Sequence, residues 1–293
     1  MLHRIPLCCA VFLACCGIAR AAIIEIDPGD DFRAAMQNLA PGDTLVMHGG
    51  TYTLSSYFEL DLAGTAGAPI EIRAAAGEQP AIHYVDDGQN IVNIADSAFL
   101  TIDGIEFSGG SRGIRLTNSS DITIRNCHVH DTAANAISAN DEGNDYARLA
   151  FVHNEIDHAG GTAEGFYLGC NEDACRVHDS LVANNYVHDL DGETVTQGDG
   201  IEIKAGSYAN VVRDNVIHDT AYPGITLYYA HADAPNVIER NLVWNSGDNG
   251  IQVTADAIVR NNIVLGAAGA GIGVHASQGG DVANLAIVNN TVL

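Results

Sequence analysis

The sequence contains a single lysine, Lys204, and its other twelve basic residues are arginines. Acidic residues number 37, so the formal net charge is −24. A surface with so little positive charge repels nucleic acid and anionic membranes, and we expect neither as a partner. After residue 21, no apolar stretch is long enough to span a bilayer, which argues against a transmembrane protein.

The first residues hold an apolar run of a different kind. MLHRIPLCCAVFLACCGIARAA has a short basic start, a short apolar run, and small residues at Ala19 and Ala21. This pattern predicts a secretory signal peptide over residues 1–21 and a secreted or periplasmic protein. A lipoprotein acylated at Cys15 is the alternative. Cleavage would remove two arginines and bring the net charge from −24 to −26.

Three of the seven cysteines lie beyond the predicted signal peptide. Cys170 and Cys175 form the close pair in CNEDAC, and in an oxidising compartment we expect a small-loop disulfide between them. Two free thiols on a loop are the alternative. Cys127 falls within an apolar strand pattern, where we expect it to be a small buried residue.

Helical periodicity is also scarce, and short repeated phrases take its place. One phrase runs from RNCHVHD at 125 to NNTVL at 289, with equivalent positions 21 to 31 residues apart. Its asparagines are Asn154, Asn185, Asn215, Asn241, Asn262 and Asn290. A second phrase, from GIRLT at 113 to GIGVH at 271, alternates with the first. Each phrase alternates in polarity and is rich in branched residues, which predicts short strands with one buried face.

Short strands at a fixed phase predict an all-β fold, a right-handed parallel β-helix, as a single domain over residues 22–293. Equivalent residues then stack about 4.8 Å apart, and the asparagines should form an internal ladder. A propeller is disfavoured because its blades need about 40 residues. Residues 22–60 should form a cap and the first strands, with a short helix over 30–39. We expect the array to be open, or continued by further chain or a partner, at its C-terminal end.

These motifs together resemble a known group of proteins. The cap, the PGDT…GTY turn, the GIxI strands and the NxVIxNNxIxD strands resemble the pectate-lyase-like superfamily of secreted β-helix proteins over most of residues 22–293. Polysaccharide lyases that cleave alginate, dermatan or pectate are the most similar in pattern. The resemblance implies a polysaccharide substrate cleaved by β-elimination. The superfamily also holds hydrolases, epimerases and non-catalytic adhesins, so glycoside hydrolysis and glycan binding without cleavage remain alternatives.

The strand GIEIK gives the predicted site its position. Ile201 and Ile203 should face the core, so Glu202 and Lys204 face outward. Aligning the coils produces two outward columns. The first column is Arg115, Ser138, Tyr167, Glu202, Thr226 and Gln252, and the second is Thr117, Asn140, Gly169, Lys204, Tyr228, Thr254 and His275. Long insertions surround the central coils, and loops of this length on a regular stack are usually functional.

The resemblance implies that Lys204 is the base that removes the proton α to a uronate carboxylate. An amine can lose its proton far more readily than a guanidinium, especially when burial or a nearby cation lowers its pKa. The resemblance also implies calcium, which we assign to Glu164, Asp199 and Glu202. Tyr167 and Tyr228 are candidates for the general acid or for sugar stacking. Arg115, Asn140 and Thr226 would bind the substrate.

Two other interpretations of these residues remain open. Paired acids among Glu164, Asp199 and Glu202 could instead serve a glycoside hydrolase, or these acids could be solvated loop residues. The histidines of the HD phrases, His130, His188 and His218, should stack with Asp157 and Trp244 as a structural column. His188 and His218 flank the coil of Lys204 in sequence, so we keep them as candidate proton donors.

Overall fold

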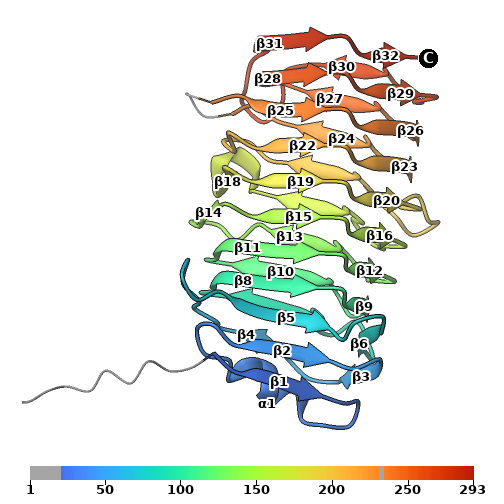
Figure 1. Cartoon of the computed structure of the whole chain (residues 1–293). Helices are drawn as coiled ribbons and strands as arrows, with labels where there is room; N and C mark the ends of the chain where they lie inside the picture. The colour runs from blue at the N-terminus through green and yellow to red at the C-terminus, as the bar shows by residue number, and fades with distance from the viewer. Residues whose placement is uncertain (1–20, 231–233) are drawn as a thin grey trace, which may run out of the picture.

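The computed structural model describes residues 21–230 and 234–293. The predicted signal peptide lies outside the described residues except for Ala21. In the described part the chain winds through a stack of coils from the N-terminal to the C-terminal end (Figure 1). Successive coils contribute strands to three sheets, and each strand pairs in parallel with the equivalent strand one coil away. This arrangement confirms the predicted all-β parallel β-helix.

The three large sheets hold 11, 10 and 9 strands, and a small separate sheet pairs β14 (Asp145–Ala147) with β18 (Arg176–His178). The first sheet comprises β1 (Ile23–Ile26), β2 (Thr44–Met47), β5 (Ile70–Ala74), β8 (Ala98–Asp103), β11 (Ser120–Arg125), β15 (Ala150–Val152), β19 (Leu181–Ala183), β22 (Val211–Arg213), β25 (Asn236–Glu239), β28 (Ala255–Arg260) and β31 (Ala283–Val288). The second sheet comprises β3 (Gly50–Leu54), β6 (Pro80–Tyr84), β9 (Glu106–Gly109), β12 (His128–His130), β16 (Glu155–Asp157), β20 (Tyr186–His188), β23 (Val216–Thr220), β26 (Leu242–Ser246), β29 (Ile263–Leu265) and β32 (Thr291–Val292). The third sheet comprises β4 (Glu59–Leu60), β7 (Val92–Ala95), β10 (Ile114–Thr117), β13 (Ile137–Ala139), β17 (Phe166–Leu168), β21 (Ile201–Ile203), β24 (Ile225–Leu227), β27 (Ile251–Val253) and β30 (Ile272–Val274).

A single α-helix, α1 (Phe32–Gln37), lies at the N-terminal end of the described stack (Figure 1). The Asp31 side chain accepts a hydrogen bond from the Ala34 N–H at 3.1 Å and caps the helix. Phe32 and Met36, one turn apart, are buried against the first coil. The predicted cap helix is therefore confirmed, although it is shorter than residues 30–39. No helix among the described residues is long and apolar enough to cross a membrane.

The strands of the third sheet bury alternate residues in the core. Ile201 and Ile203 of β21 belong to the hydrophobic cluster that fills the coil, as predicted. Glycine precedes this strand because the next coil leaves no room for a side chain. A Cβ at Gly200 would lie 2.5 Å from the carbonyl oxygen of Gly224. Close coil-to-coil contact therefore explains the glycine in the repeated GI phrase.

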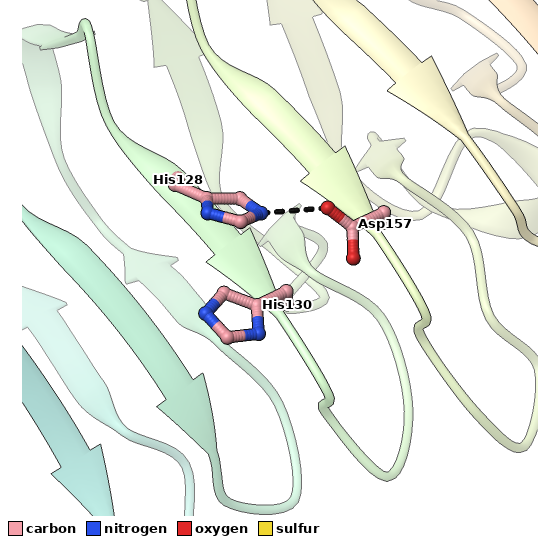
Figure 2. A group of neighbouring side chains, drawn as sticks. All are labelled: His128, His130 and Asp157. Carbon is pink, nitrogen blue, oxygen red and sulfur yellow. Dashed lines mark hydrogen bonds and ion pairs between the residues drawn. The ribbon is translucent and has the colours of Figure 1, made fainter.

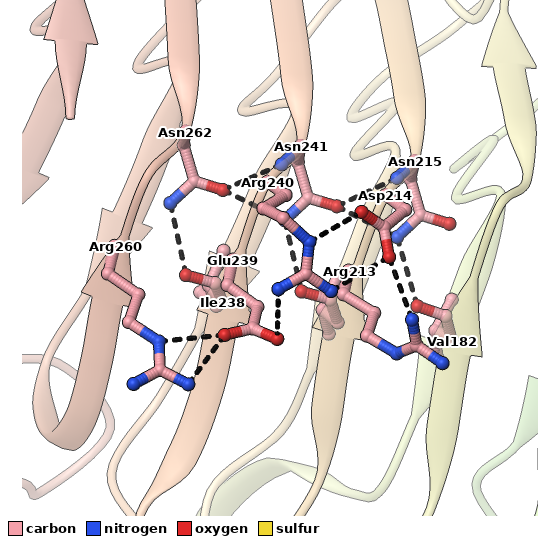
Figure 3. Close-up of polar contacts among 11 residues, drawn as sticks. Val182, Arg213, Asp214, Asn215, Ile238, Glu239, Arg240, Asn241, Arg260 and Asn262 are labelled. Carbon is pink, nitrogen blue, oxygen red and sulfur yellow. Dashed lines mark hydrogen bonds and ion pairs between the residues drawn. The ribbon is translucent and has the colours of Figure 1, made fainter. Parts of the chain in front are cut away.

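The predicted asparagine ladder is present at the bend between the first and second sheets (Figure 3). The amide nitrogen of Asn215 donates to the side-chain oxygen of Asn241 at 2.9 Å and to the Val182 carbonyl at 3.0 Å. Asn241 donates in the same way to Asn262. The residue before each of these asparagines, such as Asp214 at φ 56°, adopts the left-handed conformation that turns the chain. The ladder satisfies buried polar groups at a bend that every later coil must make.

A second ladder at the bend between the third and first sheets was not predicted. Asn210 donates to the side-chain oxygen of Asn236 at 3.0 Å, and the Ser180 N–H donates to Asn210 at 3.1 Å. The sequence carries only a weak pattern here, because the earlier coils use serines such as Ser180, the later coils use asparagines, and the surrounding loops differ in length. Cys127 is buried, as predicted.

Candidate functional site

The strand register confirms the first outward column of the third sheet. Tyr167 of β17 pairs with Glu202 of β21, and Glu202 pairs with Thr226 of β24. Lys204 and Tyr228 immediately follow β21 and β24, so they lie beside each other on adjacent coils. The side chains point away from the core, as predicted. Glu202 and Lys204 are nevertheless buried, at 2 % and 5 % exposure, because loops cover this part of the sheet.

A cavity of about 230 Å³ lies over these strands. Its lining includes Asp199, Glu202, Lys204, Thr226, Tyr228 and Gln252. Asn171 and Gln278 also line it, and the amide of Gln278 donates to the side-chain oxygen of Asn171 at 2.8 Å. These two loop residues are separated by 107 positions, so contact between them joins loops from distant coils at the cavity. The predicted cleft is thus a partly covered cavity.

The predicted disulfide is formed between Cys170 and Cys175. It closes the short loop that contains the 3₁₀ turn Asn171–Asp173. Asn171 therefore reaches the cavity from a covalently restrained loop. This loop could not be placed from the strand repeats, because it is an insertion between them.

The ammonium of Lys204 is held between two aromatic rings and one carboxylate. Its Nζ lies 4.5 Å from the centre of the Tyr167 ring and 4.9 Å from that of Tyr228. Nζ also donates a hydrogen bond to Oε1 of Glu202, which accepts a second hydrogen bond from the Tyr228 hydroxyl at 3.2 Å. Such contacts with ring faces and a carboxylate favour the charged amine.

The pKa of Lys204 is set by opposing effects. Burial lowers it, but the charge and hydrogen bond of Glu202, with a contribution from Tyr167, outweigh burial and raise the pKa above its ordinary value. In this structure Lys204 is therefore protonated. It can accept a proton only when its interaction with Glu202 is weakened.

The carboxyl groups of the cavity are crowded and buried. Burial, followed by repulsion from Glu202, raises the pKa of Asp199 to about 8. Asp199 accepts a hydrogen bond from the Thr226 hydroxyl at 2.6 Å. Burial also raises the pKa of Glu202, against the opposing influence of Lys204. The second oxygen of Glu202, Oε2, is buried without a hydrogen-bond partner.

The donors of the cavity fit a hard cation only in part. Asp199 and Glu202 face the same cavity, both carboxyl groups have a raised pKa, and Oε2 of Glu202 has no hydrogen-bond partner. A bound cation would reduce the repulsion between the two carboxyl groups and would give Oε2 a partner. Glu164 is buried one coil earlier and accepts a hydrogen bond from the Asn135 amide. It does not line this cavity. Among the described residues, Glu164, Asp199 and Glu202 do not bring three ligand atoms within 4.8 Å of one another.

Six of the predicted site residues lie outside the cavity lining: Arg115, Asn140, Glu164, Tyr167, His188 and His218. Arg115 belongs to the same column as Glu202, but it lies three coils earlier and forms an ion pair with Asp141. Asn140 follows β13 and does not line the cavity. His188 and His218 lie on β20 and β23 of the second sheet, on a different side of the coil from Lys204. Proximity to Lys204 in the sequence therefore did not place His188 and His218 at the Lys204 cavity.

The predicted histidine column is confirmed on the second sheet. Asp157 pairs with both His130 and His188 across β12, β16 and β20. The ring of His218 stacks on that of Trp244 at a centroid distance of 4.1 Å. Residues that line the cavity but were not predicted include Gln197, Asp248 and Gln278. They lie in irregular loops with no repeated pattern to locate them.

Comparison with known proteins identifies the family. A model described as the Pel9A-like, right-handed β-helix region matches residues 11–189, and a right-handed β-helix region model matches residues 178–293. The chain belongs to the Pel9A-like right-handed β-helix family. The residues around Lys204 fall in the part matched by the more general model. No match was found among curated protein sequences.

Several solved structures share the fold. Pectate lyase Pel9A aligns with a TM-score of 0.57 at 17 % identity, covering 89 % of this chain and 79 % of that one. An alginate lyase from Paenibacillus sp. str. FPU-7 aligns at 0.53 and 17 % identity, covering 92 % and 99 %. The lacto-N-biosidase of family GH136 from Eubacterium ramulus aligns at 0.51 and 12 % identity, covering 92 % and 68 %. At such identities the likeness establishes the fold and not the reaction.

Proposed function

We propose that this protein is a secreted polysaccharide lyase that cleaves a uronate-containing chain by β-elimination, with Lys204 as the base. The observation that supports this most strongly is the position of the chain's only lysine. It lies buried at a cavity, between Tyr167 and Tyr228, beside two carboxyls of raised pKa. The similarity in fold to pectate and alginate lyases is consistent with a polysaccharide substrate.

In the proposed reaction, the Nζ of Lys204 takes the proton α to the uronate carboxylate. The electrons of that C–H bond form a carbon–carbon double bond, and the bond to the 4-linked sugar oxygen breaks. Tyr228 is the proposed donor of a proton to the departing oxygen, because its pKa is raised by burial and by Glu202 and it keeps its proton. Tyr167 flanks the amine.

Lys204 must first lose its proton, and the geometry offers a route. Glu202 is the main reason that the Lys204 pKa is raised. A cation or substrate group that engages Glu202 would remove that effect and leave burial, which lowers the pKa. Asp199 and Glu202 would hold a calcium ion in this cavity, and its positive charge would make the α-proton of a bound uronate more acidic. Glu164, which is buried one coil earlier, would contribute to calcium binding only through its negative charge.

The test is an ultraviolet assay for unsaturated uronates. Purified protein is incubated with pectate, alginate and glycosaminoglycans, with and without calcium. We expect absorbance to rise on one of these substrates and Lys204→Ala to abolish the rise. Arg148→Ala, which removes a surface ion pair with Asp121, is the control and should leave activity intact. Absence of any rise with calcium present would contradict the proposal.

Hydrolysis is the second candidate, and one observation favours it. Asp199, with a pKa of about 8, would be protonated at neutral pH, and it shares the cavity with Glu202, whose Oε1 accepts a hydrogen bond from the Lys204 ammonium. An acid and a carboxylate in one cavity are what a glycosidase requires. Products that carry no unsaturation, and that vanish in Asp199→Asn and Glu202→Gln, would establish this function in place of the lyase.

A further inference from the structure

A group of metal-binding side chains lies on the second sheet, away from the Lys204 cavity. His128 and His130 alternate on strand β12, so both point to the same side of the sheet. Asp157 of β16 pairs with His130 in register. The ligand atoms of these three residues all lie within 4.8 Å of one another (Figure 2). His128 Nε2 and Asp157 Oδ2 are 2.6 Å apart.

The side chains around this group hold the ligand atoms in place. The Nδ1 of His130 lies 2.8 Å from the carboxylate of Asp131, and its Nε2 lies 3.3 Å from Oε1 of Glu106, so carboxylates on both sides hold the ring. The other oxygen of Asp157, Oδ1, is hydrogen-bonded to Nδ1 of His158. Metal-binding histidines usually have their second ring nitrogen bonded to a carboxylate or carbonyl, which fixes the ring. Here both His130 and Asp157 have such outer partners.

We propose that His128, His130 and Asp157 form a binding site for a divalent transition-metal ion of the zinc class. Two imidazole nitrogens and one carboxylate oxygen make a ligand set that suits zinc. Three protein ligands leave a fourth position for water. Calcium, which prefers oxygen ligands only, is a poor match for this set. The site is independent of the proposed lyase function.

The sequence of the second sheet shows that duplication of the coil repeat does not by itself explain the group of His128, His130 and Asp157. The position of His130 is repeated as a column that includes Asp157 and His188, which repetition alone can explain. The position of His128 is not repeated as histidine. It is Glu106 on the coil before and Glu155 on the coil after. HVH is the only His-x-His sequence in the chain, so one coil departs from the pattern to supply the second imidazole.

An adjacent group provides an internal competitor. Glu155, Asp157 and His188 also bring their ligand atoms within 4.8 Å, and they share Asp157 with the first group. His188 Nε2 is 3.8 Å from Asp157 Oδ2. This second group has one imidazole and two carboxylates, which is a weaker set for zinc. If the first group binds the ion, substitution of His188 should leave binding intact. If the adjacent group binds it, the same substitution should abolish binding.

The test is calorimetric titration of zinc into the chelator-treated mature protein. We expect one ion per chain. His128→Gln and His130→Gln should each weaken binding by more than the roughly 10–100-fold that loss of an outer partner costs. His178→Gln is a matched control, because His178 also pairs with the aspartate that follows it and faces Asp145, but has no second histidine two residues away. It should bind zinc as the wild type does.

Cobalt provides a second measurement that does not depend on heat. The intensity of its visible absorption distinguishes four-coordinate from six-coordinate ions, and we expect the four-coordinate spectrum, lost in His130→Gln. The melting temperature of each variant without metal establishes that it is folded. No zinc binding by the wild type, or binding unchanged in both His128→Gln and His130→Gln, would overturn the site. Binding lost in His188→Gln but retained in His130→Gln would equally overturn it, in favour of the adjacent group.

Discussion

The asparagine ladder and the Lys204 cavity are both built from stacked, equivalent positions, but they differ in one respect. In the ladder, Asn185, Asn215 and Asn241 make the same hydrogen bonds on every coil. In the column that passes through the cavity, Tyr167, Glu202 and Thr226 follow one another with no repetition. Repetition of a polar residue thus marks a structural role, and departure from repetition marks a candidate for chemistry.

The largest expected effect is a loss of activity on substitution of Lys204, which follows β21 and lies beside the non-repeating column at the cavity. Replacing Lys204 by arginine keeps the positive charge, but a guanidinium does not give up its proton at neutral pH. We expect kcat to fall by about 10²–10⁴-fold, the usual contribution of a general base. Initial rates of unsaturated product measure this, and an unchanged melting temperature would separate it from unfolding. Retention of most of the activity in Lys204→Arg would show that the lysine is not the base.

The next largest effect is on stability at the ladder. Asn215→Ala should lower the free energy of unfolding by about 3 kcal/mol, because the buried Val182 carbonyl and the backbone N–H of Asn185 lose the hydrogen bonds that they make with the Asn215 side chain. Asn290, which is the last rung and only half-buried, is the matched comparison. We expect Asn290→Ala to cost about 1 kcal/mol. Urea unfolding measures both, and equal losses would contradict the ladder account.

The pH dependence of stability should show the crowding of carboxyls at the cavity. The pKa of Asp199 is about 8 in the folded protein, above its ordinary value, so the folded state binds the proton more tightly than the unfolded state. Stability should therefore decline as pH rises toward 8, by up to about 2 kcal/mol between pH 6 and 8. Asp199→Asn should flatten this decline in urea unfolding with a chelator present. A wild type that is more stable at pH 8 than at pH 6 would contradict the assignment.

The smallest effect belongs to the charged residues outside the ladder. Arg240 bridges Asp214 and Glu239 on neighbouring coils (Figure 3). Its hydrogen bond is the main cause of the lowered pKa of Asp214. That contribution is present above the ordinary pKa of an aspartate and is lost as pH falls through the folded value. Because these groups are largely exposed, we expect only a slightly shallower acid decline of the melting temperature in Arg240→Ala.

Strand periodicity predicted most of the fold because it is a local property. The phrases around Asn185, Asn215 and Gly200 gave the strand type, the parallel stacking, the register and the core-facing side of each strand. The cap helix followed from its own amphipathic pattern, whereas its capping residue, Asp31, was not identified from the sequence. The ladder of Asn210 and Asn236 was missed because its residues vary in type along the stack.

The candidate site was predictable only where it lies on strands. Glu202, Thr226, Lys204 and Tyr228 came from the column alignment, and the structure brings them together with Asp199. Burial of Lys204 was not predictable, because Asn171 and Gln278 reach the cavity from loops 107 residues apart.

Neighbouring positions in sequence were misleading for the histidines, which a β-helix places on another sheet. His188 and His218 precede and follow Lys204 in the chain but lie on the second sheet, while Lys204 follows a strand of the third. A coil places consecutive strands on different sides, so proximity in space follows the sheet and not the sequence.

The most direct test of the central claim is mass spectrometry of the sugar products formed in water labelled with heavy oxygen. Elimination adds no water, so the account predicts unlabelled products whose new ends carry a double bond, formed by the wild type and not by Lys204→Ala. Products that carry the heavy oxygen and have no double bond would contradict the account and identify the cavity as that of a hydrolase.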